Sequence, residues 1–294
     1  MSNELTKTNA RAIAKRLGLP AGPLSHTQIN TYLMCPRSYY FQYVKKVPRI
    51  GWSENLLLGS ALHAGLEHVN RQKQNGARMI RVEPASQCIH SSFLASLTNQ
   101  QVTPMERKQL EEQVKKLTDL LELWVYKRLA GYNPTGVELA LYVTVAGIPM
   151  VIKIDMLDND DRVIDFKLTR KFKGAKDAQN SLQLSAYCLG TGVRRAGFIS
   201  FRFPQLDLKK KWKPELDEVF VIKKKSDLIW TEEVIGSVSN SIIDGNFPLC
   251  DPSSWKCSPQ YCDWFPICRG KVIGDTAKPK PKWMSKILRR PGDL

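Results

Sequence analysis

Two short runs of apolar, β-branched residues near the middle of the chain predict two neighbouring strands. Because side chains alternate across a strand, Asp165 and Lys167 share one face of the second strand, and Ile164 and Phe166 take the other. The two runs and the polar turn between them occupy residues 151–155, 158–161 and 163–167. The pattern therefore brings a carboxylate and an ammonium group together beside Asp155, at the end of the first strand.

Apolar residues at helical spacing predict helices before and after these strands. Ser25 and Gln28 have the form of a capping box, so a helix should begin there and run into an aromatic-rich stretch. Gln183 and Tyr187 lie four residues apart and share one helical face, which should pack over the strand ends. Ser226 is the expected cap of the last helix. The other expected helices cover 56–74, 83–97, 104–128, 174–189 and 226–244, and the other strands cover 137–146, 196–203 and 219–222.

The two acids and the lysine have the composition of a metal-assisted hydrolytic site. Asp155 and Asp165 can hold a divalent cation such as Mg²⁺, which prefers oxygen ligands. Lys167 can orient a water molecule or offset charge on a phosphate. This chemistry suits phosphodiester hydrolysis, and a hairpin with ordinary surface charges is the alternative.

Two further residues are candidates for the same site. His63 lies beside the apolar stripe of the helix at 56–74, where a histidine on its own is more often packed or exposed than bound to a metal. Glu138 lies on the strand at 137–146 and is either a contact of the metal or its waters or an exposed strand residue.

Four motifs stand in a fixed order along the chain: residues 59–67 with His63, then Asp155, then Asp165-Phe166-Lys167, then residues 183–187. Their order resembles the RecB-like exonuclease branch of the PD-(D/E)XK nuclease superfamily. The resemblance implies an α/β restriction-endonuclease-like core, in which helices flank a mixed central sheet, with a helical N-terminal cover and a C-terminal cysteine-rich iron-sulfur staple.

The resemblance also implies roles for these residues. His63, Asp155 and Asp165 would bind Mg²⁺ or Mn²⁺, together with the main-chain carbonyl of Phe166. Lys167 would orient the attacking water or offset transition-state charge. Gln183 would hold Lys167 or a phosphate in position, and Tyr187 would contact the substrate backbone. One departure from the family pattern is Ile152, which stands where the family usually has glycine.

Four of the seven cysteines crowd into residues 250–268, separated by turn-forming residues. Zinc bound by Cys257, Cys262 and Cys268 with Cys250 is one interpretation. The resemblance to AddB and CRISPR-associated exonucleases implies instead a 4Fe-4S cluster, held by Cys35 with Cys257, Cys262 and Cys268 and with Cys250 as a substitute ligand.

Two details complete the interpretation of the cysteines. The gap between Cys257 and Cys262 is four residues, whereas the family usually has two. Cys88 and Cys188 lie on expected helices and are predicted to be buried thiols. Closing a loop from Cys35 to the late cysteines is no obstacle, because the entropic cost of closure grows only slowly with length.

Composition indicates a partner of opposite charge. The 294 residues include 44 Lys and Arg against 28 Asp and Glu, a net charge of +16, which favours DNA or RNA over a merely basic surface or membrane phosphates. The lysine runs at 209–213 and 223–225 can bind phosphate, and Trp212 can stack on a base. The 43% apolar content, with no membrane-spanning run or signal peptide, leads us to expect a cytosolic protein.

We expect three regions: a basic arm or loosely docked helix at 1–22, a single nuclease domain at 23–270, and a basic flexible tail at 271–294. The expected activity is metal-dependent exonucleolytic hydrolysis of DNA from its ends, in recombination, repair or replication. The alternatives are a DNA-binding iron-sulfur or zinc subunit of a larger complex with weak or lost nuclease activity, and a zinc-binding nucleic-acid adaptor.

Overall fold

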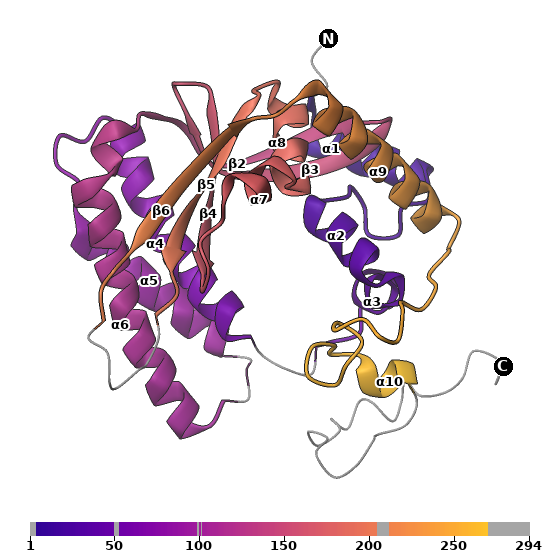
Figure 1. Ribbon diagram of the computed structural model, residues 1–294, viewed down its shortest axis with the longest axis horizontal. Helices are drawn as coiled ribbons and strands as arrows, with labels where there is room; N and C mark the ends of the chain where they lie inside the picture. The colour runs from indigo at the N-terminus through magenta and orange to yellow at the C-terminus, as the bar shows by residue number, and fades with distance from the viewer. Residues whose placement is uncertain (1–3, 50–52, 99, 101, 205–211, 270–294) are drawn as a thin grey trace.

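A mixed six-stranded sheet runs through the protein and has helices on both faces (Figure 1). A computed structural model describes residues 4–49, 53–98, 100, 102–204 and 212–269. The strands follow one another across the sheet in chain order, and all neighbours are antiparallel except the parallel pair β4 and β5. Their bounds are β1 (Glu4–Leu5), β2 (Pro134–Val145), β3 (Ile148–Asp158), β4 (Arg162–Thr169), β5 (Arg195–Arg202) and β6 (Leu216–Ile222).

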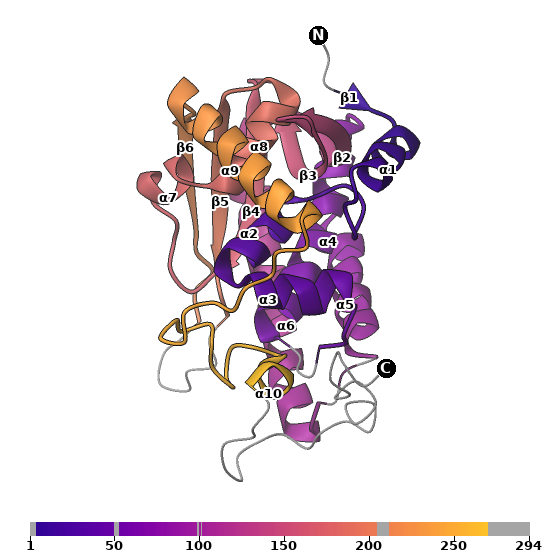
Figure 2. The same ribbon diagram turned by 90° about the vertical axis from the view of Figure 1, so that its right-hand side faces the viewer.

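The helices form two layers, one on each face of the sheet (Figures 1 and 2). The first apolar core lies beneath α1, α2, α8 and α9, and the second lies beneath α4, α5 and α6. The helix bounds are α1 (Lys7–Arg16), α2 (His26–Met34), α3 (Pro36–Tyr39), α4 (Glu54–Gln74), α5 (Val82–Leu97), α6 (Pro104–Lys127), α7 (Ala175–Gln179), α8 (Leu182–Thr191), α9 (Lys225–Ile243) and α10 (Phe265–Arg269), with short π-helical and 3-10 turns at Tyr40–Val44 and Leu129–Gly131. In the part of the chain that the structure describes, no helix is both long and apolar enough to cross a membrane.

Strand β4 has the predicted alternation. Ile164 and Phe166 belong to the core beneath α4, α5 and α6, whereas Val163 belongs to the core on the opposite face. Asp165 and Lys167 therefore point toward the α8 side of the sheet, where they form an ion pair.

The connection from β4 to β5 differs from the single helix expected at 174–189. The chain forms two helices, α7 and α8, which are separated at Asn180 and Ser181. Ser181 is the N-cap of α8, and its hydroxyl accepts a hydrogen bond from the Leu184 amide at 3.2 Å. This break starts a new helix just before Gln183 and so fixes the direction of its side chain. The expected cap at Ser226 is also wrong, because α9 begins one residue earlier, with Lys224 as its N-cap.

The first predicted helix likewise ends earlier than the sequence pattern suggests. Ser25 caps α2 as predicted and accepts from the Gln28 amide at 3.3 Å, but the helix stops at Met34. Cys35 is extended, with φ −165° and ψ 104°, because the residue before a proline avoids helical geometry. Pro36 then opens α3, and the break leaves Cys35 at a corner between two helices.

The N-terminal region is more firmly docked than the expected basic arm. Strand β1 pairs with β2 at the edge of the sheet, and Ala10 and Ala14 of α1 are fully buried. The tail predicted at 271–294 and the lysines at 209–211 lie outside the described residues.

Two residues of the predicted phosphate-binding runs have structural contacts instead. Lys223 is buried, and its Nζ donates to the carbonyl oxygens of Ala178, Gln179 and Ser181 at 2.7, 2.6 and 3.1 Å. Trp212 packs on α6, where its indole N–H donates to Asp119 at 2.9 Å. Lys223 is therefore not available to DNA. It holds the turn between α7 and α8.

We predict that Lys223→Met lowers the free energy of unfolding by about 2–4 kcal/mol, because three buried carbonyls lose their donor. Urea unfolding followed by circular dichroism measures the change. Lys225→Met is the matched control, since Lys225 is exposed two residues away and its replacement should leave the unfolding midpoint within error. Equal midpoints for the two variants would show that the turn does not depend on Lys223.

Candidate active site and cysteine cavity

The candidate site begins where strands β3 and β4 separate. The two strands pair only from Met156 to Asp158 and from Arg162 to Ile164. Beyond this point the Asp155 side chain replaces the missing ladder contact, and its Oδ2 accepts a hydrogen bond from the Phe166 amide at 2.6 Å. The separation leaves room between the strands for polar side chains at the centre of the sheet.

His63 approaches the separated strands from α4. Its Nε2 lies 3.1 Å from the carbonyl oxygen of Phe166, and its Nδ1 lies 3.5 Å from Asp155 Oδ1. Burial opposes protonation of the imidazole, but the charge and hydrogen bond of Asp155 outweigh it and raise the pKa of His63 to about 9. The predicted histidine is thus held against the predicted acid and the predicted carbonyl.

Glu138 completes this group from β2. One ligand atom from each of His63, Glu138 and Asp155 lies within 4.8 Å of the others. Burial, and then the charge of Asp155, raises the pKa of Glu138 to about 7. Of the two alternatives that the sequence left open for Glu138, the structure favours the site position over an exposed one.

The backbone explains how Glu138 reaches the site. Its φ is +49°, in the left-handed region that residues other than glycine rarely occupy. Just before it, Gly136 lies against Leu139, and a Cβ on Gly136 would meet Leu139 Cδ1 at 2.2 Å. The glycine two residues before the acid is the sequence signal that could have marked this bend in β2.

A second hydrogen-bonded group lies on the α8 side of β4. Lys167 Nζ is 2.6 Å from Asp165 Oδ2 and donates to Gln183 Oε1 at 3.0 Å. Gln183 Nε2 in turn donates to Asp165 Oδ1, and to the Tyr187 hydroxyl at 2.7 Å. Burial raises the pKa of Asp165 to about 6, although the Lys167 charge opposes the shift. The four residues predicted for this part of the site therefore form one network.

Tyr187 does not have the exposure that contact with a substrate backbone requires. Only 1% of its surface is exposed, and its hydroxyl is used by Gln183. This geometry contradicts the predicted substrate contact and places Tyr187 beneath the site, where it orients Gln183.

The donor atoms of the first group suit a divalent cation. An imidazole nitrogen and two carboxylates that converge within 4.8 Å match the ligands used by Mg²⁺ and Mn²⁺. Within the described residues, this convergent group contains Glu138 in addition to the predicted His63 and Asp155, whereas Asp165 is paired with Lys167.

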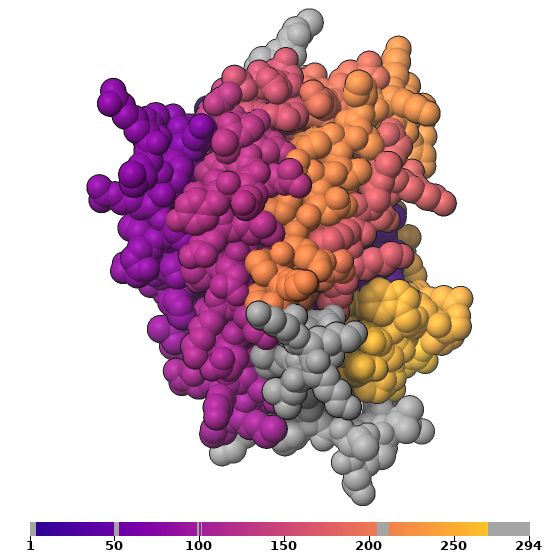
Figure 3. Space-filling model, turned by 60° about the vertical axis from the view of Figure 1, so that its left-hand side comes forward, coloured from indigo at the N-terminus to yellow at the C-terminus, as the bar shows by residue number. Residues whose placement is uncertain are grey.

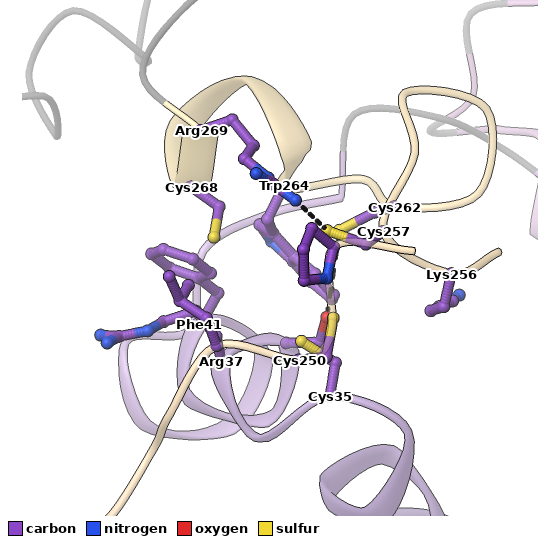
Figure 4. Close-up of a pocket in the computed structure, with 13 residues that line it drawn as sticks. Cys35, Arg37, Phe41, Cys250, Lys256, Cys257, Cys262, Trp264, Cys268 and Arg269 are labelled. Atoms are coloured by element: carbon purple, nitrogen blue, oxygen red, sulfur yellow. Dashed lines mark hydrogen bonds between the residues drawn. The ribbon is translucent and has the colours of Figure 1, made fainter. Parts of the chain in front are cut away.

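A second cavity, of about 170 Å³, is lined by thiols (Figure 4). The early and late segments of the chain meet there: Trp264 Nε1 donates to the Val47 carbonyl at 3.3 Å, and Ser38 Oγ lies 3.9 Å from Cys262 Sγ. The cysteine segment forms a lobe of its own, to the lower right of β6 and α6 in Figure 3. The cysteines that line the cavity are Cys35, Cys250, Cys257, Cys262 and Cys268.

Hydrogen bonds tune two of these thiols. Burial opposes ionisation of Cys35, but hydrogen bonds with Ser38 and Cys250 outweigh it and lower the pKa of the Cys35 thiol. Arg269 Nη2 donates to Cys257 Sγ at 3.1 Å (Figure 4). Five thiols around one cavity, from both ends of the domain, are a donor set that fits a sulfur-ligated metal centre.

The two remaining cysteines lie elsewhere. Cys188 is buried on α8, as predicted. Cys88 on α5 is only half-buried, which corrects the prediction, and its Sγ lies 3.6 Å from His68 Nδ1.

The chain belongs to the PD-(D/E)XK nuclease superfamily, because the family model matches residues 23–269. Nucleases of this superfamily use divalent metal ions, in agreement with the convergent donors of His63, Glu138 and Asp155. No curated protein matches the sequence.

Solved structures share the fold at low sequence identity. A protein from Eubacterium rectale, described by name as a candidate exonuclease, is 11% identical, with a TM-score of 0.52 over 95% of this chain and 97% of that chain. SSO0001 is 16% identical, with a TM-score of 0.35 over 76% of this chain and 99% of that chain. LHK-Exo in complex with dAMP is 11% identical, with a TM-score of 0.31 over 64% of this chain and 92% of that chain.

We predict that binding of Mn²⁺ releases protons and strengthens as the pH rises. The pKa values of Glu138 and His63, about 7 and about 9, lie above their ordinary values, so both groups carry protons near neutral pH that must leave before the donors bind a cation. Titration calorimetry in buffers of different ionisation enthalpy measures the release. His63→Ala should reduce the number of protons released, whereas His90→Ala, at an exposed position on α5, should not. An affinity independent of pH between about 6 and 9 would contradict this assignment.

Proposed function

We propose that this protein is a metal-dependent deoxyribonuclease of the RecB-like branch that degrades DNA from its ends. The observation that carries the proposal is the meeting of two groups across the separated strands. One is the cation-binding group of His63, Glu138 and Asp155, and the other is the ion pair of Asp165 and Lys167. Both groups flank the Phe166 backbone, whose amide is bonded to Asp155 and whose carbonyl faces His63.

His63, Glu138 and Asp155 would hold the cation, with the Phe166 carbonyl beside them and Asp165 as a further ligand when its pairing with Lys167 relaxes. A bound divalent cation polarises a scissile phosphate and lowers the pKa of a coordinated water. The chain must also hold the nucleophile and offset the charge that develops on the phosphate.

Lys167 is placed for that second task. Its ammonium is fixed between Asp165 and Gln183, and its side chain remains about one-third exposed (33%). Gln183 holds Lys167 through its oxygen and uses its amide group on Asp165 and Tyr187. Lys167 can therefore orient a water or stabilise a phosphate oxygen without searching for its position.

The net charge supports DNA as the substrate. A charge of +16 favours a polyanion, and contacts with backbone phosphates do not depend on sequence. An enzyme that shortens DNA from its ends needs such contacts and has no need to read base edges. Recombination, repair and replication are the processes in which this activity belongs.

The thiol-lined cavity supports an iron-sulfur centre as a second part of the proposal. Cys35, Cys257, Cys262 and Cys268 would hold a 4Fe-4S cluster, with Cys250 as the alternative ligand from the same cavity. Such a cluster would supply structural cross-linking between the two ends of the domain. The existing contacts of Val47 with Trp264 and of Ser38 with Cys262 already bring these ends together.

We predict that Asp155→Asn and Lys167→Ala each reduce DNA hydrolysis by about a thousandfold, because each removes a charge that acts on the reacting phosphate. The measurement is degradation of end-labelled single- and double-stranded DNA with Mn²⁺, beside DNA affinity in Ca²⁺. Lys153→Ala is the matched control, since Lys153 is an exposed lysine on the same strand as Asp155. If wild type and variants bind DNA alike and none cuts it, the DNA-binding subunit of a larger complex becomes the better account.

We also predict that protein purified without oxygen contains about four iron and four sulfide per chain. Cys35→Ser and Cys268→Ser should lose most of this iron, because they remove ligands from the two ends of the domain. Cys88→Ser should retain it, since Cys88 lies on α5 and does not line the cavity. Zinc without iron in the wild-type protein would favour the zinc-binding alternative.

A further inference from the structure

A histidine outside the motifs described above lies against the candidate site. Leu24 is fixed to the start of β3 by two backbone hydrogen bonds, to Pro149 at 3.0 Å and from Val151 at 2.7 Å. Ser25 then caps α2, and His26 is the first residue of that helix. The sheet itself therefore fixes the position of His26.

The ring of His26 covers Tyr187. The two ring centroids are 5.7 Å apart, and the planes are perpendicular. Tyr187 is the buried end of the network that runs through Gln183 to Lys167. His26 is half-buried, so one side of its ring packs on Tyr187 while part of the side chain remains accessible.

The charges around His26 keep its imidazole neutral. Burial, followed by the nearby Lys167 ammonium, lowers the pKa of His26 to about 4, although Asp155 opposes the shift. A neutral imidazole carries one N–H donor. Nε2 lies 3.2 Å from Thr27 Oγ1, and no hydrogen bond to Nδ1 is formed by any of the described residues.

His26 and His63 reach the site from opposite faces of the sheet. His63 belongs to α4, which covers one core, whereas His26 belongs to α2, which covers the other. The carboxylates of Asp155, Glu138 and Asp165 repel a DNA phosphate, so the strand needs hydrogen-bond donors on the side away from the cation group. On that side, Lys167 is already shared between Asp165 and Gln183.

We propose that His26 is a substrate-binding residue, whose imidazole N–H donates to a non-bridging oxygen of the DNA backbone phosphate next to the one that is cleaved. The proposal rests on the nuclease function and adds the residue that holds the strand on the α2 side. The competing role is packing alone, in which His26 only keeps Tyr187 and Gln183 in place.

Two substitutions separate these roles. His26→Phe keeps an aromatic ring over Tyr187 and removes the donor. His26→Gln keeps a donor of similar reach and removes the ring. Thermal unfolding first establishes that each variant folds, and His90→Ala serves as the histidine control because His90 is exposed on α5.

We expect His26→Phe to lower kcat/KM on single-stranded DNA with Mn²⁺ by about 10- to 100-fold, mostly through KM, because a hydrogen bond to a charged phosphate is lost. His26→Gln should recover most of that loss, and His26→Phe should also weaken DNA binding in Ca²⁺. The proposal is overturned if His26→Phe matches wild type, whether or not His26→Gln loses activity.

Failure of the nuclease function gives a different result. If wild type cuts no DNA, the nuclease proposal fails, and the Ca²⁺ binding assay alone then decides whether His26 contacts the strand. Weaker binding by His26→Phe than by wild type and His90→Ala supports the contact, and equal binding overturns it.

Discussion

The candidate site depends on the separation of β3 and β4 at the centre of the sheet. A regular ladder would occupy the Phe166 amide and carbonyl with partners from β3. Because the strands pair only up to Met156 and Ile164, the Asp155 carboxylate takes the amide and His63 lies against the carbonyl. One interruption of a backbone ladder thereby brings α4 and two strands to the same point.

The rest of the fold supports this interruption. Lys223 fixes the turn before α8, Ser181 caps α8, and the helix then presents Gln183 to Lys167. Buried polar networks of this kind hold side chains in one arrangement when every member has a partner. The precision of the Lys167 position thus originates partly in a lysine on the loop after β6.

Local patterns in the sequence were sufficient for the residues on regular elements. Alternation along β4 placed Asp165 and Lys167 on one face, and helical spacing put Gln183 and Tyr187 together. The resemblance also indicated Ile152 as a departure from the family pattern. The structure gives its physical accommodation: Gly190 on α8 leaves the space, since a Cβ there would lie 2.2 Å from Ile152 Cδ1.

Features that depend on distant contacts could not be predicted in this way. The bend at Glu138 requires a left-handed residue within a strand, and strand periodicity gives no sign of it. The burial of Lys223 depends on carbonyls more than forty residues earlier in the chain. The contact of His26 with Tyr187 joins residues from separate motifs, so neither motif alone indicates it.

The position of the metal tests the central claim most directly. Anomalous diffraction from a crystal of the protein soaked in Mn²⁺ would locate the ion independently of activity. The account predicts a peak bonded to Glu138, Asp155 and His63, beside the Phe166 carbonyl. A protein that binds Mn²⁺ only elsewhere, with His63 still bonded to Asp155, would contradict it.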